Sequence, residues 1–352
     1  MTGVVARVVL NRGDFTLDIE VAVAPGEVVA VLGPNGAGKS SLLRALCGLA
    51  AIDQGQIVIG DVVVDDPARD VFVDPARRRI GFVFQDYRLF PHLSVLDNVA
   101  FGPRSAGASG GKARDQARVW IDRFGLTDLA GRRPGEISGG QAQRVALARA
   151  LAAQPHALLL DEPLAALDIA TRQDVRAELR SHLRSFQGPT ILVTHDPLDA
   201  LVLADRVVVL ESGRVTQAGT TAQIAQRPAT SYVAQVMGLN LLRGQASAGL
   251  IALDDGGELH APDHLLAGPA LVAVRPTAIS LHAHKPEGSA RNVWAGHVTG
   301  VQPIGDRVRV TVSGAPSVVV DVTAGAVVEL GLVAGSEVWL STKATELEVY
   351  PG

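Results

Sequence analysis

A glycine-rich segment near the start of the chain carries residues that suit phosphate binding. The segment GPNGAGKS at residues 33–40 matches the spacing GxxxxGK[ST]. Its glycines let backbone N–H groups surround a β-phosphate, Lys39 can reach the β- and γ-oxygens, and Ser40 can ligate Mg²⁺. The chain has only four lysines, so a chance match is about one in a hundred or less. The candidate nucleotide-binding residues here are Gly33, Pro34, Asn35, Gly36, Ala37, Gly38, Lys39, Ser40 and Ser41.

Two adjacent carboxylates follow an apolar run in the segment LLLDEP at residues 158–163. Such a pair at the end of a buried strand is costly without a cation beside it. In phosphoryl transfer the two groups would act differently: Asp161 would lie beside Mg²⁺, whereas Glu162 would lie where water attacks the γ-phosphate.

Gln85 and His195 each follow a further apolar run. Gln85 would contact Mg²⁺ and the attacking water, and His195 would hold the γ-phosphate or the water. Either residue alone is more often an ordinary polar side chain at a strand end. In the company of the two motifs, they favour catalytic roles for Glu162, His195 and Gln85. The same reasoning predicts a Mg²⁺ site at Ser40, Gln85 and Asp161.

Apolar runs and helical patterns alternate around these residues, which is typical of a parallel sheet covered by helices. We predict strands at residues 28–32, 57–64, 80–84, 158–160, 190–193 and 206–211. We predict helices at residues 40–49, 112–124, 171–186 and 197–203, with a flexible loop at 106–111. The phosphate-binding segment then has the strand, loop and helix that its motif requires.

The pattern changes after about residue 237, where short valine-rich strands with glycine and proline turns begin. We therefore predict two domains. Residues 1–235 would form an α/β P-loop NTPase core with a helical subdomain inserted before the LLLDEP strand. Residues 240–352 would form a small all-β barrel.

The composition limits where the chain works and what it binds. The net charge is −4 and the pI is about 6.1, which disfavours nucleic acid as a partner. A single cysteine, Cys47, excludes an internal disulfide and suits a reducing compartment, and we expect it to be buried. No apolar run approaches the roughly 20 residues that span a bilayer, and no secretory leader is evident. We therefore expect a cytosolic protein, unless a partner holds it at a membrane.

The segment ISGGQAQRVALARAL at residues 137–151 lies between the two phosphate-related motifs. Together the three segments make residues 1–235 resemble the ATP-binding subunits of ABC transporters, with Ile137 in place of the usual leucine of the signature motif. The resemblance implies a head-to-tail dimer in which each ATP lies between one chain's Lys39 loop and the other chain's signature. A serine and two glycines at a helix N-terminus form a second anion cradle. The candidates are Ser138, Gly139, Gly140 and Gln141, together with Asp168 of a dimer-contacting loop in which Ala165 replaces serine.

Two further features of this family have weaker counterparts. Phe15 is the only nearby aromatic residue that could stack on adenine, but its spacing from the phosphate-binding segment is shorter than usual, and core packing is the favoured role. Residues 86–102 resemble the segment that receives the coupling helix of a membrane subunit. Their aromatic residues Tyr87, Phe90 and Phe101 could also pack in an ordinary core.

Residues 287–350 resemble the Mop domain, a small TOBE-like β-barrel module that binds molybdate or tungstate between copies. The segments SARNVWAGHV and STKATELEVY carry this resemblance. Arg291 offers planar donors to a tetrahedral dianion, Ser289 offers a hydroxyl and a backbone amide, and Lys343 offers a point charge. Thr323 falls where the module has another oxyanion donor. These residues could instead only stabilise the barrel, and Ala326 replaces a hydroxyl residue of some Mop domains.

The two resemblances together imply the ATPase subunit of a molybdate or tungstate importer, with ATP and Mg²⁺ as cofactors. Implied partners are a second copy of the chain, membrane permease subunits and, through the permease, a periplasmic or extracellular molybdate-binding protein. The subunit would then lie on the cytoplasmic face of the membrane as a peripheral protein.

Other functions stay open at this point. Importers of sulfate, iron or sugars share the ATPase half. A soluble ABC ATPase of DNA repair or translation usually has two ATPase halves or a long coiled-coil insertion, and the sequence has neither. A molybdate storage or sensing protein would need only the last part of the chain and would leave Lys39 to His195 without a purpose.

Overall fold

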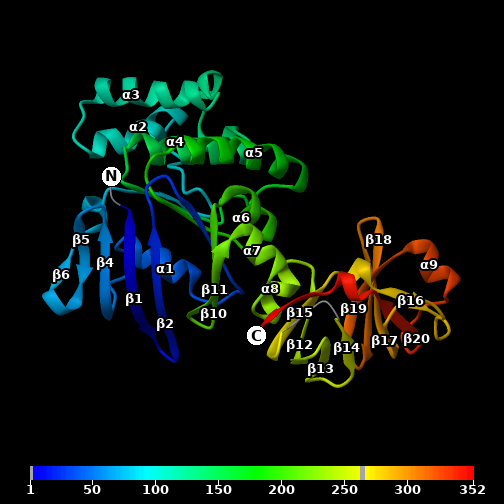
Figure 1. The fold of residues 1–352 in the computed structure, drawn as a ribbon. Helices are drawn as coiled ribbons and strands as arrows, with labels where there is room; N and C mark the ends of the chain where they lie inside the picture. Colours follow the sequence, from blue (N-terminus) through cyan, green and yellow to red (C-terminus); the bar gives the residue numbers. More distant parts are fainter. Residues whose placement is uncertain (1–2, 262–265) are drawn as a thin grey trace. The chain divides into compact units, whose positions relative to one another are not determined.

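The computed structural model describes residues 3–261 and 266–352, without the side chains of Ile169 and Ala170. The chain forms two compact units, Met1–Thr221 and Ala222–Gly352 (Figure 1). No helix within these described ranges has both the length and the apolar composition needed to cross a membrane.

A six-stranded sheet forms the centre of the first unit, in the order β11-β10-β3-β9-β8-β7. The strands are β3 (Val28–Leu32), β7 (Ile80–Val83), β8 (Ala157–Asp161), β9 (Thr190–Val193), β10 (Arg206–Glu211) and β11 (Arg214–Thr220). All pair in parallel except the edge strand β11, which is antiparallel to β10. β3 and β9 are buried along their whole length, as expected for strands covered on both faces. The predicted α/β core is therefore confirmed.

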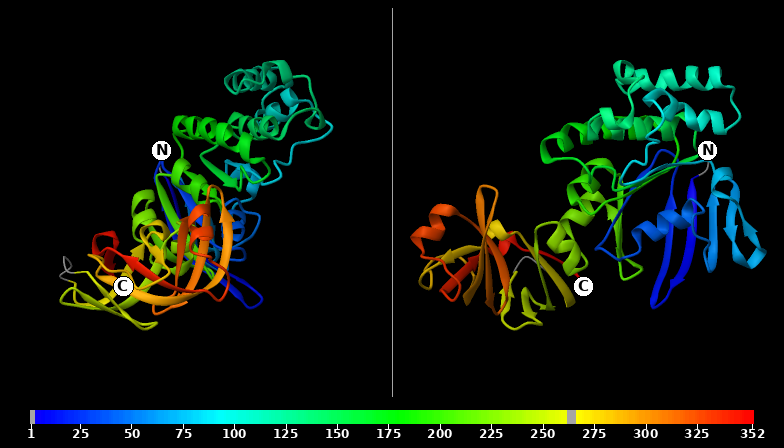
Figure 2. Two further views of the ribbon diagram at one scale, coloured as in Figure 1. Left: turned by 90° about the vertical axis from the view of Figure 1, so that its right-hand side faces the viewer. Right: turned by 180° about the vertical axis from the view of Figure 1, so that it is seen from behind.

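Helices α1 (Lys39–Leu46), α5 (Ile169–Ser185) and α6 (Pro197–Leu203) follow β3, β8 and β9. Between β7 and β8 the chain forms the helical subdomain, with α2 (Val95–Ser105), α3 (Gly110–Arg123) and α4 (Gly139–Ala152). This subdomain lies above the sheets of the first unit in Figure 1 and in both views of Figure 2. Ser94 caps α2 by accepting a hydrogen bond from the Asp97 N–H. α3 begins within the loop predicted at 106–111, since Gly110 and Gly111 are already helical.

An antiparallel sheet accompanies the central one, in the order β2-β1-β4-β5-β6. Its strands are β1 (Val4–Arg12), β2 (Phe15–Val23), β4 (Gln54–Ile59), β5 (Val62–Asp66) and β6 (Val71–Phe72). The single strand predicted at residues 57–64 was wrong, because β4 and β5 form a hairpin there. Gly60 lies in the turn with φ +64°, a left-handed conformation that glycine adopts without strain.

The second unit contains two five-stranded sheets around one core. The first sheet has the order β14-β13-β12-β15-β21, with β12 (Asn240–Ser247), β13 (Leu250–Leu253), β14 (Glu258–His260), β15 (Gly268–Val274) and β21 (Glu348–Pro351). The second has the order β16-β20-β17-β18-β19, with β16 (Ser280–His282), β17 (Asn292–Ile304), β18 (Arg307–Gly314), β19 (Val318–Thr323) and β20 (Glu337–Thr342). Val272 and Leu340, one from each sheet, lie in the same buried cluster. The predicted all-β architecture is confirmed, with α9 (Ala324–Glu329) as a short addition.

Two short helices, α7 (Thr221–Gln226) and α8 (Ser231–Val236), come next, and α8 packs against β12 of the second unit. The Tyr350 hydroxyl donates to the Pro228 carbonyl oxygen at 2.8 Å, and Arg227 forms an ion pair with Glu348 at 3.0 Å. These contacts place the division between the compact units after Thr221, ahead of the boundary predicted at 235–240.

Arg78 joins α1 to the antiparallel sheet. Its fully buried guanidinium pairs with Asp65 at 3.2 Å and donates to the carbonyl oxygens of Ala45 and Leu46 at 2.8 and 3.0 Å. These two carbonyls belong to the last turn of α1, where they have no partner inside the helix. Arg78 therefore satisfies the Leu46 carbonyl oxygen and adds a second donor to the Ala45 carbonyl oxygen, which also accepts from the Gly48 N–H at 3.1 Å.

We expect Arg78→Ala to lower the free energy of unfolding by about 3–5 kcal/mol, because it leaves the buried Asp65 carboxylate without its cation. Urea unfolding followed by circular dichroism measures the change. The matched control is Arg77→Ala, which removes the same charge from an exposed neighbour. Equal stability of the two variants would contradict this account of Arg78.

Candidate active site

The phosphate-binding segment forms a tight turn between β3 and α1. Gly36 and Gly38 have φ +80° and +104°, and Gly38 is the residue directly before the first turn of α1. The φ of +104° makes any other residue at Gly38 strained, and a Cβ atom there would also lie 2.7 Å from Leu17 Cδ1. The turn leaves the N–H groups at the start of α1 available to an anion.

Lys39 is held inside this turn. Its ammonium donates to the carbonyl oxygens of Gly33 and Pro34 at 2.7 and 3.0 Å. Burial lowers the pKa of Lys39, while the nearby Glu162 and Asp161 carboxylates partly offset that effect. The Lys39 ammonium is therefore held by backbone acceptors of the turn itself.

A hollow of about 250 Å³ lies over the turn. It brings together most of the predicted phosphate-binding residues with one carboxylate; the lining residues are Phe15, Asn35, Gly36, Ala37, Gly38, Lys39, Ser40, Ser41 and Glu162. Phe15 also packs partly against the hydrophobic core. Both interpretations of Phe15, adenine stacking and core packing, thus agree with its position.

A second hollow, of about 540 Å³, contains the three predicted metal ligands Ser40, Gln85 and Asp161. The Ser40 side chain is hydrogen-bonded to Asp161. Burial and the adjacent Glu162 raise the pKa of Asp161, and the Ser40 hydrogen bond opposes them. A divalent cation would remove this electrostatic cost.

The donor set of this hollow fits Mg²⁺. Hydroxyl, amide and carboxylate oxygens are hard ligands, and Mg²⁺ usually keeps several waters and substrate phosphates beside one or two carboxylates. Across residues 3–261 and 266–352, no cluster of three or more His, Cys, Asp or Glu suited to a metal ion is present. The site therefore suits a cation that arrives with a phosphate ligand rather than an all-protein cage.

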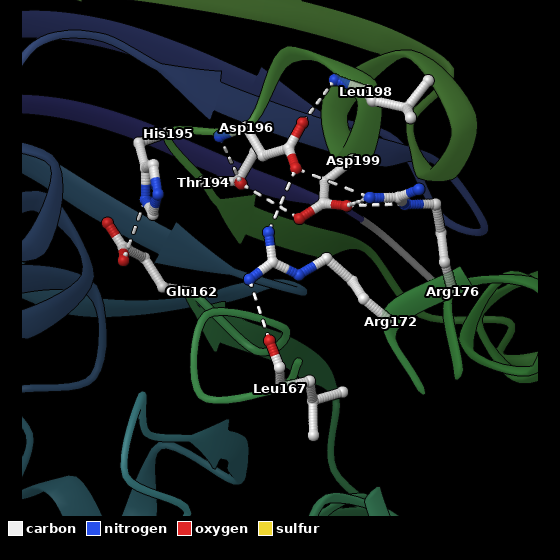
Figure 3. A network of polar contacts seen from close by, with 9 residues as sticks. All are labelled: Glu162, Leu167, Arg172, Arg176, Thr194, His195, Asp196, Leu198 and Asp199. Carbon is white, nitrogen blue, oxygen red and sulfur yellow. Dashed lines mark hydrogen bonds and ion pairs between the residues drawn. The ribbon is translucent and has the colours of Figure 1, made fainter. Parts of the chain in front are cut away.

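Glu162 and His195 face each other across neighbouring parallel strands (Figure 3). The Glu162 Oε2 atom lies 3.1 Å from His195 Nδ1. Glu162 has φ +46°, and its N–H donates to the Val193 carbonyl oxygen at 2.9 Å. A non-glycine residue in this left-handed region is strained, and such residues cluster at functional sites. The backbone of β9 thus fixes the direction of the Glu162 side chain.

The segment after Gln85 is also strained and is held by a residue that sequence reasoning missed. Tyr87 and Arg88 have φ +58° and +43°. Arg149 of α4 donates to both of their carbonyl oxygens at 2.7 Å. An arginine inside a regular helical pattern gives no signal of such a role. Arg149 connects the helical subdomain to the turn that follows Gln85.

The aromatic residues of the segment 86–102 divide between the core and the surface. Tyr87 is buried, and its hydroxyl donates to the Pro163 carbonyl oxygen at 3.3 Å. Burial raises the pKa of Tyr87 to about 12. Phe90 and Phe101 contact each other with ring centroids 4.5 Å apart, and Phe101 is 42% exposed. Tyr87 thus packs in the core, whereas Phe101 reaches the surface.

The signature residues form the N-terminus of α4. Ser138 accepts a hydrogen bond from the Gln141 N–H, and the Gln141 side chain accepts one from the Ser138 N–H. Gly140 is buried, and a Cβ atom there would lie 3.3 Å from Thr171 and Val175 of α5. None of residues 138–141 lines either hollow of this chain. Asp168 caps α5 by accepting from the Thr171 N–H at 3.0 Å.

The four oxyanion candidates in the second unit are all exposed. Asn292 of β17 pairs with Thr342 of β20, so the flanking residues Arg291 and Lys343 are neighbours. Thr323 pairs with Arg307, beyond the far end of β17, and its hydroxyl caps α9 by accepting from the Ala326 N–H. The strand register of one chain therefore brings Ser289, Arg291 and Lys343 to one end of β17 and Thr323 to the other.

Comparisons with known proteins agree with this geometry. A family model for ABC transporters matches residues 17–165, and a model for the TOBE domain matches residues 288–349. The chain is 42% identical over 350 residues to the molybdenum import ATP-binding protein ModC of Mycobacterium tuberculosis, covering 96% of this chain and 95% of that protein. It is 40% identical over 311 residues to the Fe(3+) ions import ATP-binding protein FbpC of Streptomyces avermitilis, covering 86% and 88% of the two proteins.

A solved structure is also similar. It is the dimeric, post-hydrolysis state of the ATP-binding cassette MJ0796 bound to ADP and Pi, with a TM-score of 0.52 and 31% identity. The match covers 62% of this chain and 98% of that one. Because near-full-length relatives, a matching family model and a nucleotide-binding geometry agree, this chain belongs to the ABC transporter family, as an ATP-hydrolysing protein of the import ATP-binding type.

Proposed function

We propose that this chain hydrolyses ATP as the cytoplasmic-face subunit of a molybdate importer, working as a head-to-tail pair that drives a separate membrane permease. One observation carries the catalytic part of the proposal: the Glu162–His195 pair, 3.1 Å apart, lies beside the Lys39 turn. A carboxylate held in a strained turn next to a phosphate cradle suits the activation of water.

Each residue then has a separate task in hydrolysis. Glu162 orients the attacking water and accepts its proton. His195 contacts Glu162 through Nδ1, so its Nε2 is the nitrogen that faces the γ-phosphate or the water. Lys39 exchanges its backbone acceptors for β- and γ-oxygens. Mg²⁺ at Ser40, Gln85 and Asp161 would neutralise the charge that develops on those oxygens.

The signature segment supports a paired arrangement. Residues 138–141 present a helix N-terminus, yet they line neither hollow of their own chain. A second copy, arranged head to tail, supplies that anion cradle to the Lys39 turn. The similarity to a dimeric ATP-binding cassette bound to ADP and Pi supports the same arrangement.

The proposal of molybdate as the substrate rests on how much of this chain one relative matches. The molybdenum import relative matches 96% of this chain, which includes the all-β second unit, whereas the iron import relative matches 86%. Arg291 and Lys343, neighbours at one end of β17, provide cationic donors for a tetrahedral dianion. Iron import is the second candidate, because its relative is almost equally identical where it matches.

We expect Glu162→Gln to reduce ATP turnover by about 100-fold or more while ATP binding is preserved, because the amide cannot accept a proton from water. Steady-state phosphate release and calorimetric titration with ATP measure the two properties. With hydrolysis blocked, ATP should also shift the variant to a dimer in light scattering. Glu20→Gln, an exposed site on β2, is the control. Turnover at the parent rate in Glu162→Gln would overturn the assignment.

The paired arrangement predicts complementation between two inactive chains. A Lys39→Ala chain loses the phosphate cradle, and a Ser138→Arg chain blocks the signature. A mixed pair contains one intact site, formed by Lys39 of one chain and Ser138 of the other, so the mixture should recover ATP hydrolysis that neither variant has alone. Mixing Lys39→Ala with Ser40→Ala is the control, since both substitutions damage the same cradle. No recovery in the first mixture argues against the head-to-tail pair.

The substrate proposal predicts that the full chain binds molybdate and tungstate more tightly than sulfate in equilibrium dialysis. Arg291→Ala should weaken molybdate binding by about 1.5–3 kcal/mol, the contribution of a charge-assisted hydrogen bond. Arg243→Ala removes an exposed charge from the other sheet of the same unit and should leave the affinity unchanged. Equal or absent binding of all three anions would contradict an oxyanion role for this unit.

A further inference from the structure

A network of arginines and aspartates lies next to the Glu162–His195 pair (Figure 3). Arg172, in the first turns of α5, donates through Nη2 to the Leu167 carbonyl oxygen at 3.0 Å. Its Nη1 atom lies 3.5 Å from Asp196 Oδ2. A planar guanidinium can make both contacts at once, which an ammonium cannot. Arg172 therefore joins two segments that are not neighbours in the sequence.

The first of these segments follows Glu162. The Ala165 N–H donates to the Glu162 carbonyl oxygen at 3.1 Å, and the Leu167 N–H donates to the Leu164 carbonyl oxygen at 3.2 Å. The chain from Glu162 to Leu167 is thus a series of tight turns. Arg172 holds the last carbonyl of this series while β9 holds the first N–H. Both ends of the segment that begins with Glu162 are fixed.

The second segment follows His195. The Asp196 N–H donates to the Thr194 hydroxyl at 3.0 Å, and Asp196 Oδ1 accepts from the Leu198 N–H at 2.8 Å at the start of α6. The other carboxylate oxygen, Oδ2, faces Arg172 and Arg176 at 3.5 Å. The residue next to His195 is therefore held by three elements. A shift of Asp196 would turn the imidazole of His195 away from Glu162.

Arg172 also lies close to the segment that follows Gln85. Its charge opposes the rise that burial causes in the pKa of Tyr87, so the guanidinium lies within electrostatic reach of that ring. The Tyr87 hydroxyl in turn contacts the carbonyl oxygen of Pro163, the residue after Glu162. Segments that follow three predicted catalytic residues therefore converge around one arginine.

The neighbouring Arg176 already links α5 to α6. Arg172 is therefore not needed for that attachment. Arg176 pairs with Asp199 at 2.6 Å, and both side chains are buried. Burial and the nearby Asp196 raise the pKa of Asp199, and Arg176 opposes them, so this pair already balances the buried charge. Arg172 contacts backbone and carboxylate at longer distances, and its Nε atom has no hydrogen-bond partner among the described residues. Such a buried unpaired donor costs free energy.

We propose that Arg172 is a positioning residue for ATP hydrolysis. It fixes the segments that follow Glu162 and His195, so that the side chains of these two residues point toward each other. The proposal rests on the proposed roles of Glu162 and His195. Arg172 lines neither hollow, so it acts through Leu167 and Asp196 rather than on ATP. Its loss should slow the chemical step and leave nucleotide binding in place.

The test compares Arg172→Gln, Arg172→Lys and Arg180→Gln in the full chain. Arg180 is exposed on the same helix and is the matched control for charge. We expect Arg172→Gln to lower kcat about 10-fold, which corresponds to about 1.4 kcal/mol in the barrier. KM for ATP and the melting temperature should stay close to those of the parent. Arg172→Lys keeps the charge and loses one of the two contacts, so its kcat should be intermediate.

A second measurement separates positioning from general stability. Asp196→Asn weakens the same link, so the double variant Arg172→Gln/Asp196→Asn should have a kcat no lower than the slower single variant. Additive losses in kcat, a raised KM with unchanged kcat, or an equal loss in Arg180→Gln would each overturn the proposal. Should Arg172→Gln fail to fold, a parental kcat in Arg172→Lys overturns it equally.

The same assays also test the proposed function itself. Parental turnover in Glu162→Gln, or no turnover in the unsubstituted chain, would remove the basis for both proposals. An inactive Glu162→Gln together with a fully active Arg172→Gln would remove only the positioning role.

Discussion

The register of four parallel strands is the constraint on which the active site depends. β7 pairs with β8, β8 with β9, and β9 with β3, and the pairing brings Val83 opposite Leu160, Asp161 opposite Val193, and Val193 opposite Val31. The carboxyl ends of these four strands therefore lie side by side, along one edge of the sheet. Polar groups are costly inside such a sheet, so they follow the strands at that edge. The phosphate turn, the carboxylate pair, Gln85 and His195 meet there for that reason.

Arginine side chains hold the irregular segments that leave this edge. Arg149 donates to two carbonyl oxygens of a strained turn, and Arg172 donates to the Leu167 carbonyl oxygen. Backbone groups outside helices and sheets still need partners when they are buried. A guanidinium has five donors in a fixed plane and can satisfy two acceptors together. This chain has few lysines and many arginines. Its arginine side chains can therefore orient loops as well as neutralise charge.

The sequence predicted the elements whose pattern is local. The buried strands β3, β9 and β10 and the helix α6 have the predicted bounds, because apolar runs flanked by turn residues are unambiguous there. The hairpin of β4 and β5 was missed, although Gly60 and Asp61 separate two apolar runs by the two residues of a tight hairpin turn. The residue types of the phosphate turn and the carboxylate pair predicted side chains that the structure brings together around two hollows. The roles of Arg149 and Arg172 could not be predicted from the sequence, because they depend on carbonyl oxygens of other segments of the chain.

The distribution of parts between the chain and its proposed partner indicates where hydrolysis is controlled. Glu162 and His195 already contact each other within one chain, and Lys39 already lies in its turn. Ser138 and Gln141, by contrast, satisfy each other at the start of α4. In the proposed pair, a second chain would therefore add no general base. It adds donors to the phosphates, whose contribution grows as charge develops in the transition state. In the proposed pair, the approach of α4 would set the rate, and a partner that moves the helical subdomain would control ATP turnover without contacting Glu162, the proposed general base.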